Sequence, residues 1–145
     1  MKKLVKILVV IMILTLSLGL FACRGEEGRV TLVVKGTQIK TYTVDTTGKE
    51  LSTLQDLMDY LEENEEFLYT VESGMVSEIN GRVANGANRE FWGIYTDLKI
   101  GEIPYFDNSW GTASIDGKTY GSALKGINEL PLSGGFTYLF EIATW

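Results

Sequence analysis

The sequence contains no histidine and a single cysteine among its 145 residues, and both shortages exclude common kinds of chemistry. Without histidine, neither a Ser-His-Asp nor a Cys-His catalytic arrangement can be built. Zinc sites are excluded as well, since they rely on clusters of cysteine and histidine. One cysteine cannot form an internal disulfide, and no phosphate-binding Gly-x-x-x-x-Gly-Lys motif is present. We therefore expect neither a metal site nor a resident cofactor.

Carboxylates are in good supply, with 19 aspartate and glutamate residues. Two carboxylates alone can carry out glycoside hydrolysis, and Glu90 and Asp107 are candidates for such a pair. A chain with so many acidic residues offers pairs of this kind by chance, so we expect that the protein is not an enzyme. The acidic residues within 62–66 lack the glycine-spaced loop of a calcium site and predict a solvated face.

The first 22 residues have the layout of a secretory signal. Three lysines within the first six residues are followed by an unbroken apolar run over residues 7–14 and by further leucines. Ala22 then precedes the lone cysteine, Cys23, as in the lipobox of bacterial lipoproteins. A free thiol would be a reactive liability in an exported protein, and attachment of lipid would remove it. We expect a signal peptide at residues 1–22, lipid on Cys23, and a short linker up to residue 29.

A membrane helix that is never cleaved is the alternative interpretation of this segment. Only 16 residues separate Lys6 from Cys23, whereas a membrane span needs roughly 20, so the lipoprotein interpretation is favoured. The linker of residues 24–29 would reach about 20 Å when fully extended. The remaining domain, residues 30–145, would then lie close to the outer face of the cell membrane.

Charge excludes another class of partner. Removal of residues 1–22 takes away three of the 13 basic residues and none of the 19 acidic residues, which leaves a net charge of −9. Nucleic acids and anionic lipid head groups repel such a domain. We therefore expect no nucleic-acid partner, and we expect contact with the membrane through the lipid on Cys23.

The first part of the domain has the pattern of two strands and a helix. Apolar residues alternate over residues 30–35, a Gly-Thr pair suits a tight turn, and residues 39–44 are rich in Thr, Tyr and Val. A capping box of Ser52 and Gln55 predicts where a helix begins, and Asn64 is its predicted end. The apolar residues on one side of this helix are Leu51, Leu54, Leu57, Met58 and Leu61.

Strands predominate in the remainder of the domain. Residues 67–72 predict a short strand. Residues 74–95 predict two strands joined by a polar crossing, and Met75 and Ile79 should share one face of the first. Gly93 stands between bulky neighbours in the second strand, which predicts a close approach to its backbone.

A hairpin and a closing strand complete the expected fold. Asp116-Gly117 between short polar and β-branched segments is a strong hairpin signal, and residues 136–145 alternate as a final strand. Two strands, a helix and then several strands predict an α+β fold. The simplest architecture with that order is a β-grasp-like sheet with one amphipathic helix on one face, plus an extra β-hairpin insertion.

Short motifs in this domain resemble a known family. In chain order they are Gly74, Val76, Ile79-Asn80-Gly81, Trp92, Tyr95, Gly126-Ile127, Leu132 and Gly134, followed by an aromatic-rich terminal strand. Their order and spacing are similar to those of the transcobalamin C-terminal-like domain, which is common in lipoproteins of Gram-positive bacteria. The resemblance covers residues 30–145. It implies a β-grasp-like fold, a lipoprotein of a Gram-positive cell, and a corrinoid as the candidate ligand.

Three features depart from that family. Thr96-Asp97-Leu98 stands where the family has Val-Asn-Gly, and Gly134-Gly135 stands where it has Gly-Asp before the last strand. The segment of residues 97–122 is longer than the usual connection. This segment lies where a ligand could be covered. The identity of the ligand therefore stays open.

Aromatic residues concentrate among glycines in the second half of the domain. In our hypothesis a loop of residues 105–110 covers Trp92 and Tyr95, because aromatic faces offer large contact areas and polar neighbours can orient an amide-rich molecule. The alternative places Trp92 and Tyr95 in the core. Trp110, in a setting of Gly, Asn and Ser, is expected to be exposed. The predicted ligand-binding residues are Trp92, Tyr95, Tyr105, Phe106, Asp107, Asn108 and Trp110.

Two functions of different classes agree with these observations. One is a membrane-anchored binding module that captures a corrinoid or another amide-rich small ligand and passes it to a membrane transporter. The other is a surface interaction or adhesion module that binds wall components or a protein partner. A concave aromatic pocket would favour the first, and an exposed apolar patch without a pocket would favour the second.

Overall fold

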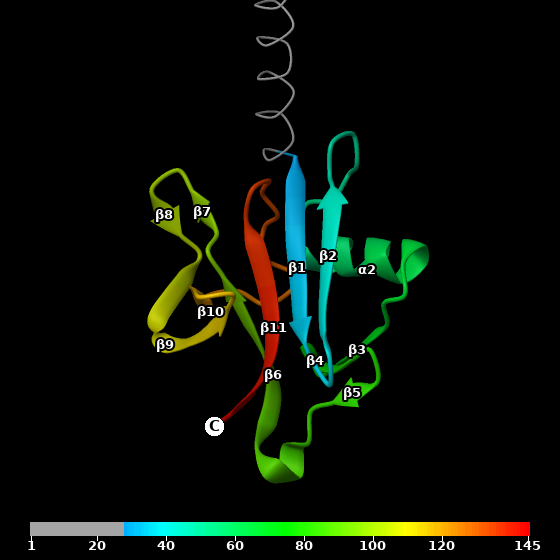
Figure 1. Ribbon diagram of the computed structural model, residues 1–145, viewed down its shortest axis with the longest axis vertical. Coiled ribbons are helices and arrows are strands. Elements are labelled where there is room, and N and C mark those ends of the chain that lie inside the picture. The colour runs from blue at the N-terminus through cyan, green and yellow to red at the C-terminus, as the bar shows by residue number, and fades with distance from the viewer. Residues whose placement is uncertain (1–27) are drawn as a thin grey trace, which may run out of the picture.

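The protein is seen in a computed structural model, which describes residues 28–145 (Figure 1). The expected signal peptide and the expected lipid site at Cys23 lie outside the described residues. The described chain has a mixed α+β fold, with a six-stranded sheet and one α-helix as its main parts.

The main sheet has the strand order β2-β1-β11-β6-β10-β9. Its strands are β1 (Arg29–Lys35), β2 (Ile39–Asp45), β6 (Glu90–Thr96), β9 (Phe106–Ile115), β10 (Lys118–Ala123) and β11 (Thr137–Thr144). The first and last strands, β1 and β11, pair in parallel, and the other pairs are antiparallel. An N-terminal hairpin joined to a parallel C-terminal strand is the arrangement of a β-grasp. The fold class predicted from the sequence is therefore confirmed.

The helix α2 (Leu54–Asn64) begins with a capping box that differs from the predicted one. Thr53 is the N-cap in place of Ser52, and Asp56 completes the box in place of Gln55. The Asp56 carboxylate accepts the backbone N–H groups of Ser52 and Thr53 at 2.8 and 2.9 Å. These two bonds lower the pKa of Asp56. A carboxylate is a stronger acceptor for such groups than a neutral amide, which favours the observed start.

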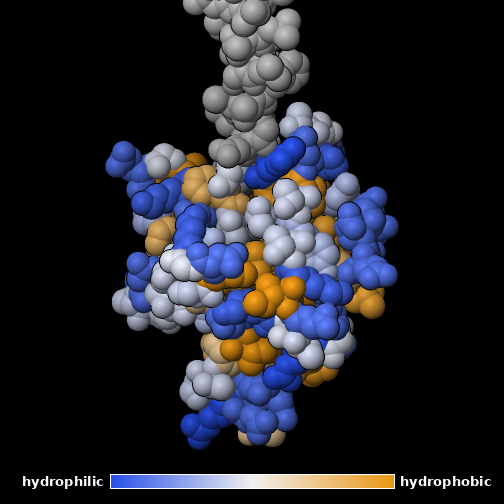
Figure 2. Space-filling model, in the orientation of Figure 1, coloured by the Kyte–Doolittle hydropathy of each residue, from blue (hydrophilic) through white to orange (hydrophobic). Residues whose placement is uncertain are grey.

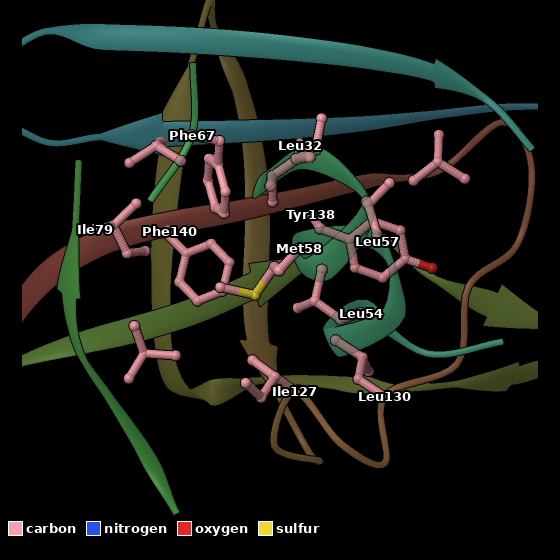
Figure 3. Close-up of a cluster of buried hydrophobic side chains, with 14 of the residues drawn as sticks. Leu32, Leu54, Leu57, Met58, Phe67, Ile79, Ile127, Leu130, Tyr138 and Phe140 are labelled. Atoms are coloured by element: carbon pink, nitrogen blue, oxygen red, sulfur yellow. The ribbon is translucent and has the colours of Figure 1, made fainter. Parts of the chain in front are cut away.

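The core lies between α2 and the main sheet (Figure 3). Apolar side chains of the helix meet those of β1 and β11, so the predicted burial of the helix leucines is confirmed. The one hydroxyl in this group, on Tyr138, donates to the carbonyl of Pro131 at 2.7 Å. The labelled core residues are Leu32, Leu54, Leu57, Met58, Phe67, Ile79, Ile127, Leu130, Tyr138 and Phe140.

A small second sheet extends this core. Its strands, in the order β3-β4-β5, are β3 (Tyr69–Glu72), β4 (Met75–Ile79) and β5 (Arg82–Val83). Val76 and Ile79 are buried, whereas Met75 is 58% exposed. The prediction that Met75 and Ile79 share one face is therefore wrong. The pairing of β3 with β4 shifts register, and an irregularity of this kind disrupts the simple alternation that the prediction assumed.

The β9–β10 hairpin, at one edge of the main sheet, folds over the opposite face of the sheet, where Ala113 and Tyr120 pack with Val33 and Leu139. Its turn is the predicted Asp116-Gly117 pair, in which both residues have positive φ. The Lys35 ammonium group links the two layers, because it contacts the Glu141 carboxylate at 2.6 Å and the Ser114 carbonyl at 3.1 Å. The buried residues between the layers are Val33, Tyr95, Ala113, Tyr120 and Leu139.

Two short elements complete the described chain. A separate hairpin is formed by β7 (Lys99–Ile100) and β8 (Ile103–Pro104), and η1 (Gly86–Asn88) is a short 3-10 helix before β6. The β7–β8 hairpin and all but the last residue of the β9–β10 hairpin fall within residues 97–122, where the extra hairpin insertion was expected. Figure 2 shows hydrophobic residues in small separate groups on the visible face, bordered by hydrophilic ones.

Candidate binding groove

A groove of about 300 Å³ lies beside β6. Three segments line it: residues 74–76 at the start of β4, residues 91–94 of β6, and residues 122–127 at and beyond the end of β10. Sites for small molecules commonly have volumes of about 300–1,000 Å³. The groove is therefore large enough for a small ligand or for part of a larger one.

The groove exists because β10 separates from β6. Along β6, the pairing with β10 is confined to Tyr95 and Thr96. Beyond Ser122 the chain follows β9 instead, and the N–H of Leu124 donates to the carbonyl of Tyr105 at 3.0 Å. Before Tyr95, β6 therefore pairs with β11 on one side, and no strand of the described chain pairs with its other side.

A hydrogen bond at the start of β6 shows which peptide groups face the open side. The carbonyl of Arg89 accepts the N–H of Trp145 at 3.2 Å, next to β11. In an antiparallel pair, successive residues direct their peptide groups to alternate sides. The even-numbered residues of β6 therefore direct their peptide groups away from β11. Those that line the groove are Trp92 and Ile94. The carbonyl of Ile94 borders the last pair with β10, Tyr95 with Ser122, so we call the peptide group of Trp92 and the N–H of Ile94 the open edge.

The side chains around the groove are mainly apolar. Met75 and Leu124 are 58% and 40% exposed on its rim, whereas Trp92 and Ile127 are buried at its base. The indole N–H of Trp92 donates to a backbone carbonyl of β5 at 3.2 Å, which fixes the ring. Among the lining residues, Lys125 carries the one ionisable side chain.

Trp92 and Tyr95 lie on opposite faces of the sheet, because they are three residues apart in one strand. The ring of Tyr95 covers Gly93, where an added Cβ would come within 2.8 Å of the ring. The close approach predicted at Gly93 is therefore confirmed. Burial, helped by the nearby Glu141 carboxylate, raises the pKa of Tyr95. Tyr95 packs beneath the β9–β10 hairpin and does not reach the groove.

The predicted loop around Trp110 is instead the first part of β9. Asp107 and Thr112 stand opposite consecutive residues of β10, so residues 108–111 bulge from the edge of the sheet. Within the bulge, the Asp107 carboxylate accepts the N–H and the hydroxyl of Ser109 at 2.8 and 2.6 Å. These bonds lower the pKa of Asp107. Trp110 is 70% exposed, as the sequence predicted.

The other predicted residues of this segment pack against their own domain. Phe106 and Asn108 cover Gly121 so closely that no Cβ would fit there. Tyr105 packs half-buried against the core on the helix side. Of the seven predicted ligand-binding residues, Trp92 lines the groove, and the structure does not bring the others together with it.

Apart from Trp92, sequence reasoning missed the residues of the groove, among them Met75, Leu124 and Lys125 on its rim. Single exposed apolar residues are normal on protein surfaces and carry no recognisable pattern. They become a shared rim because β4 and the segment after β10, which are far apart in the sequence, both border β6.

Residues 28–145 contain neither a metal-binding cluster nor a membrane-spanning helix. Within this range no three histidine, cysteine, aspartate or glutamate side chains gather closely enough to hold a metal ion. No helix in the same range has both the length and the apolar character that a membrane crossing requires.

Comparisons with known proteins bear on the fold. No model of a protein family matches the sequence, and no curated protein sequence matches it. A crystal structure from Ruminococcus gnavus ATCC 29149, described as a "putative metal binding protein", is similar, with a TM-score of 0.50 and 11% sequence identity. The similarity covers 82% of this chain and 99% of that chain. At this identity the similarity concerns the fold alone.

Proposed function

We propose that this chain is a lipid-anchored binding module on the outer face of the cell membrane, without enzymatic activity, and that the groove is its recognition site. The observation that supports this most is the combination of an exposed apolar rim and an open edge in one concavity. Apolar walls with a few converging polar groups are typical of ligand sites. The lipid on Cys23 would keep the module beside a membrane transporter that receives the ligand.

Amide groups are the ligand chemistry that fits this site. The peptide groups of Trp92 and Ile94 offer hydrogen bonds of the kind that amides accept and donate, while Met75 and Leu124 contact apolar atoms between the amides. Corrinoids carry many peripheral amides, which agrees with the family resemblance, and peptides carry amides too. Because the chain has no histidine, it offers no imidazole to cobalt, and a corrinoid would be held by its periphery.

The groove is tested by titration of the full-length chain in detergent micelles with cobalamin, cobinamide and blocked peptide amides. We expect at least one of these ligands to bind, with quenching of tryptophan fluorescence beyond the inner-filter control. Met75→Asp should weaken binding about tenfold or more, because a carboxylate on the apolar rim would be desolvated. Ile103→Asp is the matched control, since Ile103 is 67% exposed on the separate β7–β8 hairpin. Absence of binding by all these ligands would contradict the proposed function.

The exposed tryptophan on the β9 bulge favours a second candidate, a surface interaction module. Trp110 is held 70% exposed by a bulge that Asp107 stabilises, and large exposed aromatic rings are frequent anchors in interfaces. In this case the chain should co-sediment with purified cell-wall sacculi. Trp110→Ala should then weaken the association by about 1–3 kcal/mol. Unchanged sedimentation of the variant would exclude Trp110 as the anchor.

The lipid anchor has its own test. Cys23→Ala should abolish incorporation of radiolabelled palmitate, because the thiol is the expected site of acylation. Ala22→Ser keeps the cysteine and a small preceding residue, and it serves as the matched control that should still be labelled. Equal labelling of the wild type and Cys23→Ala would exclude a lipoprotein.

A further inference from the structure

We infer that the groove binds its ligand as an added strand, so that an extended peptide segment pairs with the open edge of β6. This inference rests on the proposed function, because it names the ligand class of the same groove. The added strand would continue the sheet next to β6, on the side that β10 leaves at Ser122.

The backbone arrangement carries the first step. β11 pairs with β6 along its whole length, from Glu90 to Thr96, whereas β10 stops at Tyr95. The open edge therefore presents the N–H and carbonyl of Trp92 and the N–H of Ile94 within a concave site. Another extended backbone has complementary donors and acceptors at the same spacing, which is the basis of strand addition in peptide recognition.

The side chains around the edge suit a strand as well. Side chains of a strand alternate between its two faces. Residues on one face of an added strand would contact the apolar rim of Met75 and Leu124 and the base formed by Ile127. Residues on the other face of the added strand would make no contact with that rim. The groove therefore favours a peptide in which apolar and polar residues alternate over a peptide that is apolar throughout.

The charges near the groove further restrict which peptides it can bind. Lys125 is the one ionisable lining residue, and its partner Glu129 lies 3.6 Å away, with both side chains more than half exposed. An exposed pair of this kind is weak, so a carboxylate in the ligand can replace Glu129. The domain has a net charge of −9 after removal of residues 1–22, which disfavours peptides with many acidic residues. We therefore expect a peptide with alternating apolar residues and a single acidic residue.

The probe is a blocked hexapeptide of alternating valine and threonine with one glutamate, added to the isotope-labelled full-length chain in detergent micelles. Amide hydrogen exchange read by NMR is the measurement. We expect exchange at Trp92 and Ile94 to slow about tenfold or more when the strand forms. The same peptide, N-methylated at alternate residues so that its pairing side is blocked, should give no protection.

Two pairs of variants test the edge and the charge. Ile94→Pro removes both the open-edge N–H and the isoleucine side chain. Ile94→Ala removes the same side chain but keeps the N–H, so it is the matched control. We expect the proline variant to bind the peptide about tenfold more weakly than the alanine variant. If the proline variant fails to fold, the N-methylated peptide still decides the question. Lys125→Glu should weaken binding of the glutamate peptide and favour a lysine peptide.

The possible outcomes separate the inference from the proposed function. Peptide binding with protection at Trp92 and Ile94 supports the inference. Peptide binding without protection there, or equal binding of the N-methylated peptide, overturns it and leaves the binding module standing. Binding of a corrinoid in the groove with no peptide binding also overturns the inference alone. No binding of either ligand overturns both.

Discussion

The two faces of the main sheet are covered in different ways. On one face, α2 and the small sheet β3-β4-β5 close over a cluster of 17 buried residues that includes Trp92. On the other face, the β9–β10 hairpin closes over five buried residues that include Tyr95. A polar contact supplements the smaller cluster, since the Lys118 ammonium group pairs with the Asp97 carboxylate at 2.5 Å.

The difference indicates where most of the stability of this fold lies. Burial of apolar surface is the dominant favourable term in folding. We therefore expect the helix side to unfold only with the whole domain, and the hairpin side to open locally at lower cost. The groove lies at the border of these two covers, because β4 of the helix side and the segment after β10 both line it.

The largest expected effect tests the helix side. Leu57 is fully buried between α2 and the sheet, so Leu57→Ala should lower the free energy of unfolding by about 2–5 kcal/mol. Chemical denaturation would measure this change. Leu68→Ala is the control, since Leu68 is 66% exposed and its truncation should have little effect. Similar small changes in both variants would mean that α2 does not hold the main core.

A smaller effect is expected on the hairpin side. Gly117 has a φ of 77° in the turn between β9 and β10, and a side chain there costs about 1–2 kcal/mol. Gly117→Ala should therefore speed amide exchange in β9 and β10 while exchange in α2 stays slow. Gly86→Ala is the control, because Gly86 has open space around it and no positive φ. An equal increase of exchange in α2 would show that the two faces do not open separately.

The smallest effect concerns the start of the helix. Thr53→Ala removes the N-cap side chain and should lower the free energy of unfolding by about 1 kcal/mol. Ser52→Ala keeps the backbone N–H that donates to Asp56, so its effect should be close to zero. Thermal melts of the two variants would compare them directly. A greater loss in Ser52→Ala would restore the capping box that the sequence first suggested.

Local patterns predicted most of the fold. The Asp116-Gly117 turn, the apolar side of α2 and its end at Asn64 all depend on residues within a few positions of one another. One error arose where two local choices were nearly equal, and the error at Met75 and Ile79 arose from the register shift between β3 and β4. Ser52 and Thr53 both begin a capping pattern, and the carboxylate of Asp56 decides between them.

The candidate site was far less predictable than the fold. From the sequence, aromatic residues were predicted as ligand contacts because of their large contact area. Of these, Trp92 does line the groove, and Trp110 is exposed as predicted. The spacing of Trp92 and Tyr95 in one strand places them on opposite faces, but the sequence could not show that the β9–β10 hairpin covers Tyr95. Contact area is a property of a residue type, whereas a shared site depends on which segments lie side by side.

The sequence by itself determined the kinds of element, their order and the face of α2 that enters the core, because propensity and periodicity act over short distances. The tertiary structure alone decided which side of β6 stays open. That side depends on where the pairing of β10 with β6 ends, at Ser122. Just beyond that point the N–H of Leu124 bonds to the carbonyl of Tyr105, 19 residues earlier in the chain. Hydrogen-bond partners at such a separation are selected by packing of the whole domain, so no local pattern records them.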